Sequence, residues 1–314
     1  MPSSPARIVV VGSANTDLVV RVSNLPRPGE TVIGGTFASV GGGKGANQAV
    51  AAARAGGRTT FIAKLGADAM GDAALAAFAA DGIDTTFITR DPATPSGVAF
   101  ILVDDRGENS IAVAAGANDR LTPADIDRAG AAIRAADILL VQLEIPLETV
   151  RHAVAVAHAA GVPVILNPAP ARPLDAGLLA QVAILTPNET EAELLTGLAV
   201  TDERSAASAA GRLLAAGPQS AVITLGGRGA VVGEAAATDH VAGHVVTPVD
   251  TVAAGDVFNG CLAVAIAEGK SLVEASRFAN AAAAIAVTRH GAQASAPRRD
   301  EIFRFQSSRE GLPS

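Results

Sequence analysis

The sequence predicts an α/β fold of three layers, in which helices cover both faces of a mostly parallel central sheet. Short runs rich in β-branched residues alternate along the chain with longer, alanine-rich segments. The short runs are continuously apolar instead of alternating with polar residues, as is typical of strands that are buried on both faces. We therefore expect the strands to form the core and the helices to shield them from water.

Predicted strands and helices alternate through the first two thirds of the chain. The strands are expected at residues 8–11, 59–62, 138–141, 164–166, 183–185 and 221–224. The helices are expected at residues 46–55, 73–80, 124–135, 147–159, 189–195 and 206–215. The last third adds strands and then two long helices, at residues 230–233, 240–247, 255–267 and 272–288.

Two segments interrupt this alternation, at about residues 18–40 and 97–114. Each holds two short apolar runs on either side of a turn, which is typical of an antiparallel hairpin. The runs lie at residues 18–22, 31–37, 98–103 and 110–113. We expect them to pair into a small β-sheet that covers the carboxyl ends of the parallel strands as a lid. Residues 1–314 then form a single α/β domain that carries these lid segments.

The composition excludes several classes of protein. The 314 residues carry 24 basic and 31 acidic side chains, a net charge of −7, and only 3% are aromatic. A chain without a basic surface or aromatic stacking groups is a poor nucleic-acid binder. The one cysteine, Cys261, excludes a disulfide framework and any site with several cysteine ligands. Proline and glycine break the uncharged run at residues 153–171, so we expect no membrane partner and a soluble, cytoplasmic protein.

A glycine-rich motif opens the predicted helix at residues 46–55. It has the sequence Gly-Gly-Gly-Lys-Gly-Ala-Asn-Gln and spans residues 41–48. Glycines let a ligand approach the backbone closely, and helix N-termini attract oxygen-rich ligands. Lys44 is followed by Gly45 rather than by Ser or Thr, so the motif is not a P-loop. The alternative interpretation is a tight turn before a helix.

A second motif places two acidic residues, Asp250 and Asp256, on either side of a turn of small residues before an apolar helix. The backbone N–H groups of residues 253–255 could converge there on one anion. A carboxylate beside such an anion hole suits removal of a proton from an alcohol while charge develops on a phosphoryl group. Alternatively, Asp256 only caps the helix or interacts with its dipole.

Two further patterns are less specific. Asn188 and Glu191 lie three residues apart on one helix face, where they could hold magnesium through its water molecules. A simple N-terminal helix cap explains them equally well. The glycine loop at residues 224–229 lies between two strands, so it could form a wall against a flat ligand such as a nucleotide. The alternative is a hairpin turn.

Polar residues also follow two of the predicted strands. Asn15 and Asp17 come after the strand at residues 8–11, and Glu144 comes after the strand at residues 138–141. The carboxyl ends of strands are where α/β sheets place ligand contacts, although each residue could also belong to a turn or cap. No dinucleotide-binding glycine fingerprint directly follows the first strand, which disfavours a nicotinamide dehydrogenase.

In their order along the chain, these motifs resemble those of the phosphofructokinase-B-type carbohydrate kinase family. The resemblance covers about residues 7–305, and its most specific blocks are residues 166–171, 186–193, 281–289 and 291–293. It implies ATP-dependent phosphorylation of D-ribose at the 5-hydroxyl, giving D-ribose 5-phosphate and ADP. The alternatives are a kinase for 2-deoxyribose or another furanose or nucleoside, and a non-catalytic sugar-binding protein. A pure binder would not need Asp256.

The resemblance also implies roles for individual residues. Asp256 would be the catalytic base, and the anion hole would be formed by Ala253, Ala254 and Gly255. The sugar would be held by Asn15, Asp17, Gly43, Lys44, Gly45, Ala46, Asn47, Glu144 and Asp256. The nucleotide would be contacted by Asn188, Thr224, Leu225, Gly226, Gly227, Arg228, Gly229, Gly255, Asp256 and Asn280. Some members of the family carry a histidine at the position of Asn280.

Two kinds of cation follow from the same resemblance. Magnesium would accompany ATP and would be positioned by Glu191 and Asn188. Potassium would act as an activator, held largely through carbonyl oxygens by Asp250, Val252, Ala286, Arg289, Gly291 and Ser295. The resemblance further implies a homodimer that pairs through the lid strands about a two-fold axis.

Overall fold

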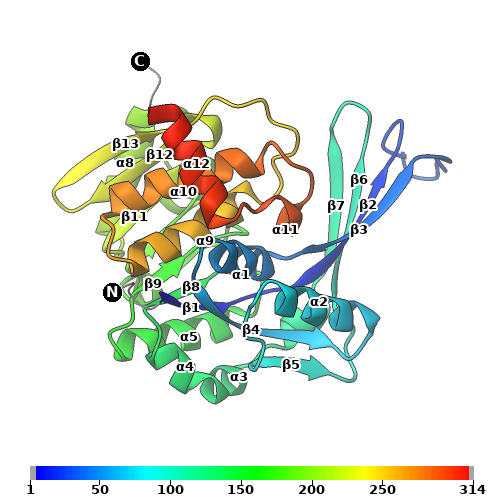
Figure 1. Ribbon diagram of the computed structural model, residues 1–314, viewed down its shortest axis with the longest axis horizontal. Helices are drawn as coiled ribbons and strands as arrows, with labels where there is room; N and C mark the ends of the chain where they lie inside the picture. Colours follow the sequence, from blue (N-terminus) through cyan, green and yellow to red (C-terminus); the bar gives the residue numbers. More distant parts are fainter. Residues whose placement is uncertain (1–4, 311–314) are drawn as a thin grey trace.

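The computed structural model describes residues 5–310, so the predicted single-domain span reaches residues 1–4 and 311–314, which lie outside the described residues. Within the described residues, nine strands form one large sheet and four strands form a separate, smaller sheet. Helices lie on both sides of the large sheet (Figure 1). The predicted α/β fold, with a mostly parallel central sheet and a small second sheet, is confirmed.

The large sheet is parallel except at one edge. From that edge its strands are β13 (Ala237–Ala242), β12 (Gly229–Glu234), β11 (Ser220–Thr224), β10 (Ile184–Leu185), β9 (Val164–Leu166), β8 (Ile138–Val141), β1 (Arg7–Val11), β4 (Arg58–Gly66) and β5 (Ile88–Asp91). The strands from β11 to β5 pair in parallel, whereas β12 and β13 add an antiparallel hairpin. The carboxyl ends of the parallel strands therefore meet along one edge of the sheet.

The strand β1 shows why the apolar runs are continuous. Ile8 and Val10 pack into the core on one face of the sheet, and Val9 and Val11 pack into the core on the other face. All four side chains are buried. Because successive strand residues point to opposite faces, a strand that is covered on both sides has no position for a polar residue.

Two groups of helices build these two cores. The first core includes α1 (Lys44–Arg54), α2 (Ala69–Ala80), α9 (Ala254–Ala267), α10 (Leu272–Ala286) and α12 (Arg299–Glu310). The second includes α3 (Pro123–Arg128), α4 (Gly130–Arg134), α5 (Leu147–Ala159), α6 (Ala176–Leu179), α7 (Glu189–Thr196) and α8 (Glu203–Ala215). In the part of the chain that the structure describes, no helix combines the length and the hydropathy that a membrane span requires.

The smaller sheet projects from the body of the molecule (Figure 1). Its strands, in order, are β3 (Thr36–Gly42), β2 (Asn15–Arg21), β6 (Gly97–Val103) and β7 (Asn109–Ala114). Two antiparallel hairpins, β2–β3 and β6–β7, join through a parallel pairing of β2 with β6. Since β2 follows β1 after three residues, the base of this sheet lies at the carboxyl ends of the parallel strands.

Some predicted boundaries are wrong. The strand expected at residues 31–37 begins only at Thr36, because Gly34 and Gly35 have φ angles of 105° and 101° that interrupt an extended strand. The strand expected at residues 240–247 ends at Ala242. The apolar residues beyond it line a cavity instead of joining the sheet. The helix expected at residues 124–135 is divided into α3 and α4 at Ala129, and β5 and α12 had no predicted counterpart.

The helices α1 and α9 lie unusually close together. A Cβ atom at Gly260, in the middle of α9, would be 2.6 Å from the carbonyl oxygen of Gln48 and 2.7 Å from the Cβ atom of Ala51. Both of these neighbours belong to α1. The missing side chain of Gly260 is therefore what lets the two helix backbones approach each other.

We predict that Gly260→Ala destabilises the protein by about 1–3 kcal/mol, because the added methyl group overpacks the α1–α9 contact. Gly211→Ala is the matched control, since Gly211 also lies within a helix but has no atom within 4 Å of the place that an added methyl group would occupy. There the higher helix propensity of alanine should stabilise the protein by about 0.5–1 kcal/mol. Urea unfolding of both variants measures the difference, and equal effects would contradict this account of the contact.

Candidate active site

Two cavities share a wall at the start of α9. The smaller, of about 170 Å³, is lined by Lys44, Asn167, Ala169, Thr186, Asn188, Glu191, Thr224, Thr251, Ala253, Ala254, Gly255, Asp256 and Asn259. The larger, of about 550 Å³, lies between the glycine loop after β11 and the helices α9 and α10. Both cavities are lined by Thr224, Thr251, Ala254 and Gly255. A ligand that filled the larger cavity would reach the smaller one across these residues.

The start of α9 has an uncommon backbone conformation. Ala253 precedes the helix with φ 59° and ψ 10°, a left-handed conformation that is rare for a residue with a side chain. Such residues cost free energy and gather at functional sites. The first backbone N–H groups of a helix have no partners within the helix, so they attract anions. Ala253, Ala254 and Gly255 all line the smaller cavity, and the N–H of Ala254 also donates to the carbonyl oxygen of Thr251 at 3.4 Å. The anion hole at residues 253–255 stays a prediction.

Asp256 is buried in the first turn of α9 and is held by α1. The side-chain amide of Asn47 donates to its Oδ2 at 2.9 Å, and that of Gln48 donates to its Oδ1 at 2.9 Å. Burial raises the pKa of the carboxyl group, while the positive charge of Lys44 and the two amide hydrogen bonds oppose this rise. These contacts with α1 go beyond the helix-capping or dipole role that was the alternative for Asp256.

Lys44 lies among several carboxylates. Burial alone would lower the pKa of the ammonium group, but the negative charges of Asp256, Glu144 and Glu191 raise it. The pKa of Asp17 rises to about 6 because the side chain is buried and the charges of Glu144 and Asp256 are near. The site thus has an excess of negative charge, which it can offset by binding cations or by holding a proton.

Glu144 and Asn15 are both fixed by hydrogen bonds. The hydroxyl of Ser13 and the backbone N–H of Lys44 both donate to Glu144 Oε2, at 2.6 Å and 3.0 Å. The side-chain amide of Asn118 donates to Asn15 Oδ1 at 2.8 Å. The structure therefore brings the polar residues that follow β1 and β8 to the same place as the glycine motif, as the sequence predicted.

Two glycines of the motif are required by the chain itself. Gly43 has φ 87°, and a Cβ atom there would be 2.8 Å from the backbone nitrogen of Asn15. A Cβ atom at Gly45 would be 2.6 Å from backbone atoms of Gly12 and Ser13. The start of α1, which includes Ala46, thus packs directly on the connection between β1 and β2.

Asn188 and Glu191 form a reciprocal cap at the start of α7. Asn188 Oδ1 accepts from the N–H of Glu191, and Glu191 Oε2 accepts from the N–H of Asn188, both at 2.8 Å. The alternative interpretation of this pair as a helix cap is therefore correct. Both side chains also border the smaller cavity, and burial raises the pKa of Glu191. A capping role and a role toward a hydrated cation are thus compatible.

The glycine loop after β11 forms one wall of the larger cavity. Its lining residues among the predicted nucleotide contacts are Thr224, Gly226, Gly227, Gly229, Gly255 and Asn280. Leu225 is 2% exposed and belongs to the core on the other face of the sheet. The structure does not bring this side chain to the cavity.

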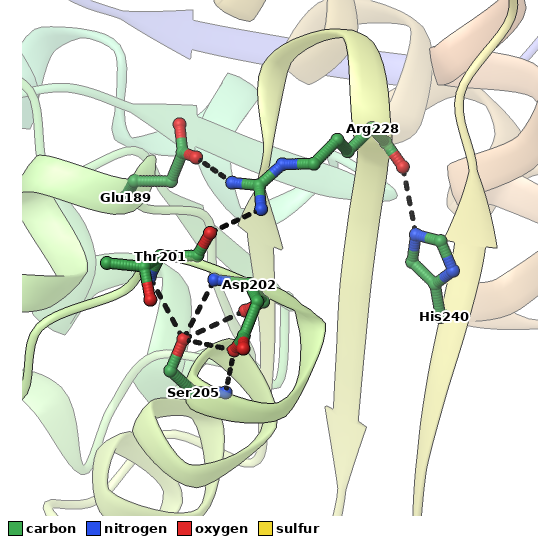
Figure 2. Close-up of polar contacts among 6 residues, drawn as sticks. All are labelled: Glu189, Thr201, Asp202, Ser205, Arg228 and His240. Carbon is green, nitrogen blue, oxygen red and sulfur yellow. Dashed lines mark hydrogen bonds and ion pairs between the residues drawn. The ribbon is translucent and has the colours of Figure 1, made fainter.

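Arg228, which was also predicted to contact the nucleotide, is not among the residues that line the cavity. Its side chain extends toward Glu189 and Thr201 (Figure 2). Its guanidinium forms an ion pair with Glu189 at the start of α7 and donates to the carbonyl oxygen of Thr201 at 2.5 Å. Its own carbonyl oxygen accepts a hydrogen bond from Nε2 of His240 at 2.8 Å. These contacts tie the glycine loop to two neighbouring elements, so the side chain supports the loop rather than lining the cavity.

The predicted potassium-site residues lie on two segments that Asp250 connects. Its carboxylate accepts from the backbone N–H groups of Val252 and Gly291, each at 3.0 Å. The Arg289 guanidinium pairs with Glu301, and Ser295 donates to the carbonyl oxygen of Ala292, so these two side chains have protein partners. Among the described residues, no group of three or more His, Cys, Asp or Glu side chains could hold a metal ion. The carbonyl oxygen of Ala286 accepts a hydrogen bond from the backbone N–H of Arg289 at 3.0 Å. The potassium site stays a prediction.

The sequence analysis missed a set of buried polar residues behind Asp256. These are Gln48, Gln142, Asn167, Thr186 and Asn259, which are joined by side-chain hydrogen bonds. A signal for three of them was present, because Gln142, Asn167 and Thr186 directly follow the strands β8, β9 and β10. The rule that drew attention to Glu144, a polar residue after a buried strand, applies to each of them.

Several known proteins are similar to this chain over nearly its whole length. A ribokinase of Haemophilus influenzae is 47% identical over 298 residues, which cover 95% of this chain and 97% of that protein. A deoxyribokinase of Salmonella typhi is 38% identical over 304 residues, covering 96% of this chain and 99% of that protein. The structure of an Arabidopsis thaliana ribokinase complexed with ribose and ATP superposes with a TM-score of 0.88 at 34% identity, covering 96% of this chain and 99% of that chain.

A family model supports the same conclusion over nearly the whole chain. The model of the pfkB family carbohydrate kinases matches residues 5–299, a span that includes both cavities and the small sheet. The chain therefore belongs to the pfkB family of carbohydrate kinases.

Proposed function

We propose that this chain transfers the γ-phosphoryl group of ATP to the 5-hydroxyl of D-ribose, giving D-ribose 5-phosphate and ADP. The observation that carries the proposal is the place of Asp256, a buried carboxylate at the helix start where a smaller polar cavity meets a larger one. The relatives named ribokinase, at up to 47% identity, support the choice of sugar.

The sugar site of this proposal lies between the glycine motif and the base of the small sheet. Its members are Asn15, Asp17, Gly43, Lys44, Gly45, Ala46, Asn47 and Glu144, together with Asp256. Carboxylate and amide oxygens accept hydrogen bonds from sugar hydroxyls, and the Lys44 ammonium donates to their oxygens. The small sheet would cover the bound sugar as a lid and exclude water from the transfer step.

The nucleotide would occupy the larger cavity, with its base between the glycine loop and Asn280 and its phosphates toward Gly255. Magnesium fits the polar smaller cavity, where Glu191 and Asn188 would hold it through water. When bound, it would neutralise charge on the phosphates. Because ATP is the co-substrate, we also propose that the chain acts in the cytoplasm.

In the transfer step, Asp256 accepts the proton of the ribose 5-hydroxyl as that oxygen attacks the γ-phosphorus. The new oxygen–phosphorus bond forms while the bond between the γ-phosphorus and the bridging oxygen breaks, and ADP leaves with that electron pair. Lys44 and the N–H groups at residues 253–255 stabilise the negative charge on the transferring group. The excess of carboxylates around Lys44 keeps this lysine protonated for that role.

The second candidate substrate is 2-deoxyribose, which is favoured by the 38% identical deoxyribokinase. Other furanoses and nucleosides are further alternatives within the class. A non-catalytic sugar-binding protein would need neither a buried carboxylate at the helix start nor a nucleotide cavity beside it.

An ADP-release assay across ribose, 2-deoxyribose, fructose and nucleosides tests the proposed function. We expect the highest kcat/KM with ribose, and we expect Asp256→Asn to bind ribose while losing about 10²–10⁴-fold in turnover. A higher kcat/KM for another sugar would identify that sugar, and not ribose, as the preferred substrate. Near-normal turnover of Asp256→Asn would overturn the assignment of the base.

The pKa of Asp17, raised to about 6, predicts that ribose binding depends on pH. The ionised carboxylate accepts two hydroxyl hydrogen bonds, whereas the protonated form accepts fewer, so affinity should fall as the pH drops through about 6. Calorimetric titration with ribose between about pH 5 and pH 7.5 measures this change. Asp17→Asn should bind more weakly at the higher pH and should lose the pH dependence. The same slope in both proteins would exclude Asp17 as its source.

We further propose that potassium activates the enzyme from the loops joined by Asp250. Turnover should rise when potassium replaces tetramethylammonium at equal ionic strength, because the cation would order the segment before the anion hole. Asp250→Asn should weaken the response, since it removes the charge that links both loops. An unchanged rate in the native protein would reject the site.

Finally, we propose a homodimer that forms through the small sheet. By the strand register, Phe37 and Phe100 share the face of this sheet opposite to Asp17, and they are 66% and 56% exposed. Exposed apolar side chains on one sheet face are typical of an interaction surface. Sedimentation at micromolar concentration should show a dimer that Phe100→Glu weakens. A strictly monomeric native protein would contradict pairing through this sheet.

A further inference from the structure

Asp256 is one member of a closed circuit of buried polar groups. From its carboxylate the circuit runs through Gln48, Asn167, Thr186 and Asn259 and returns to the carbonyl oxygen of Gly255, the neighbour of Asp256. The five bonds measure 2.9, 3.1, 2.9, 2.6 and 2.8 Å in that order. The proposed base and the proposed anion hole are therefore held by the same set of side chains.

The direction of each amide in this circuit is determined by a backbone carbonyl. Asn167 donates to the carbonyl oxygen of Thr186, which can only accept, so the Oδ1 atom of Asn167 must face Gln48. The Gln48 side chain can satisfy that oxygen only with its Nε2 group. The same Nε2 group donates to Asp256 Oδ1.

Gln142 holds the other end of Gln48. Its Nε2 donates to Gln48 Oε1 at 2.5 Å, and both side chains are fully buried. The Oε1 atom of Gln142 has no hydrogen-bond partner among the described residues. It lies against Gly12, where a Cβ atom would be only 2.1 Å away. Gln142 is thus oriented so that its Nε2 group donates to Gln48, although this orientation leaves its own Oε1 atom without a hydrogen bond.

We infer that Gln48 is a positioning residue for Asp256, held by Asn167 and Gln142 in the one amide orientation that presents an N–H donor to the carboxylate. A reversed amide would face two acceptor oxygens, those of Asn167 and Asp256, in a buried region where such contacts are unfavourable. The donor fixes the direction of the carboxylate and favours its ionised form, which a base requires. This inference rests on the proposed role of Asp256 as the base.

Other charged groups also face the carboxylate of Asp256. Lys44 opposes the rise of its pKa, whereas Asp17, Glu144 and Glu191 add negative charge near it. The described hydrogen bonds of the Gln48 side chain run only to Gln142, Asn167 and Asp256. A change of pH profile on substitution of Gln48 therefore reports on Asp256 rather than on the other carboxylates.

The test compares Gln48→Met and Gln142→Met, each of which replaces an amide by an unbranched apolar chain of similar length. For Gln48→Met we expect kcat to fall about 10-fold to 100-fold, because the carboxylate of Asp256 loses a hydrogen-bond donor. For the same reason, the acidic limb of the pH profile of kcat should move up by about one pH unit. KM for ribose and for ATP should change little. Gln142→Met should shift the limb in the same direction by less, although Gln142 does not contact Asp256. The double variant should match Gln48→Met alone.

Thr149→Val is the control for loss of one buried hydrogen bond elsewhere. Its hydroxyl is buried in α5 and donates to the carbonyl oxygen of Leu121 at 2.7 Å, on the other face of the sheet. This variant should lower the melting temperature and leave the pH profile unchanged. A Gln48→Met protein that melts lower but keeps a normal acidic limb would overturn the inference and reduce Gln48 to a structural role.

Gln142→Met alone tests whether Gln142 orients the amide of Gln48 toward Asp256. The inference therefore stays testable if Gln48→Met does not fold. If the acidic limb of the pH profile of kcat does not shift in Gln142→Met, the claim that Gln142 acts through Gln48 is wrong. Failure of the proposed function would be recognised separately, because Asp256→Asn would then retain turnover.

Discussion

The contact between α1 and α9 is the constraint on which the candidate site depends. Gly260 allows the two helix backbones to approach, and this approach places Asn47 and Gln48 on the carboxylate of Asp256. The glycine motif at the start of α1 extends the same principle, since Gly45 packs against the backbone that leads from β1 into β2. The start of α1 and the start of α9 are thus both positioned by backbones that have no side chain between them.

The electrostatics of the site follow from that dense packing. Burial and the negative charge of nearby carboxylates raise the pKa of Asp17 and Asp256. The charges of Asp256, Glu144 and Glu191 raise the pKa of Lys44. In a chain with a net charge of −7, an anionic nucleotide must bind through local groups. The start of α9, Lys44 and the two proposed cations supply positive charge where the phosphates would lie.

Sequence reasoning predicted the architecture because strands and helices depend on local patterns, whereas the roles of the site residues follow from the family resemblance and stay predictions. Continuous apolar runs located the strands of the large sheet, and polar residues after two strands located Asn15, Asp17 and Glu144. The same reasoning failed where a side chain's direction depends on distant partners. Arg228 lies in the glycine loop, but its guanidinium pairs with Glu189 and donates to the carbonyl oxygen of Thr201 (Figure 2). It is not among the residues that line the cavity. The apolar residues after Ala242 resembled a strand, yet they line a cavity.

By itself, the sequence determined the layer order, the two-sheet organisation and the order of the motifs, because hydrophobic periodicity and glycine spacing act over a few residues. Only the tertiary structure decided which polar groups meet. Gln48, Gln142 and Asn167 are separated by up to 119 residues along the chain, and each has several possible partners of equal chemistry. Their hydrogen bonds, and so the environment of Asp256, exist only because the parallel strands end side by side beneath α1 and α9.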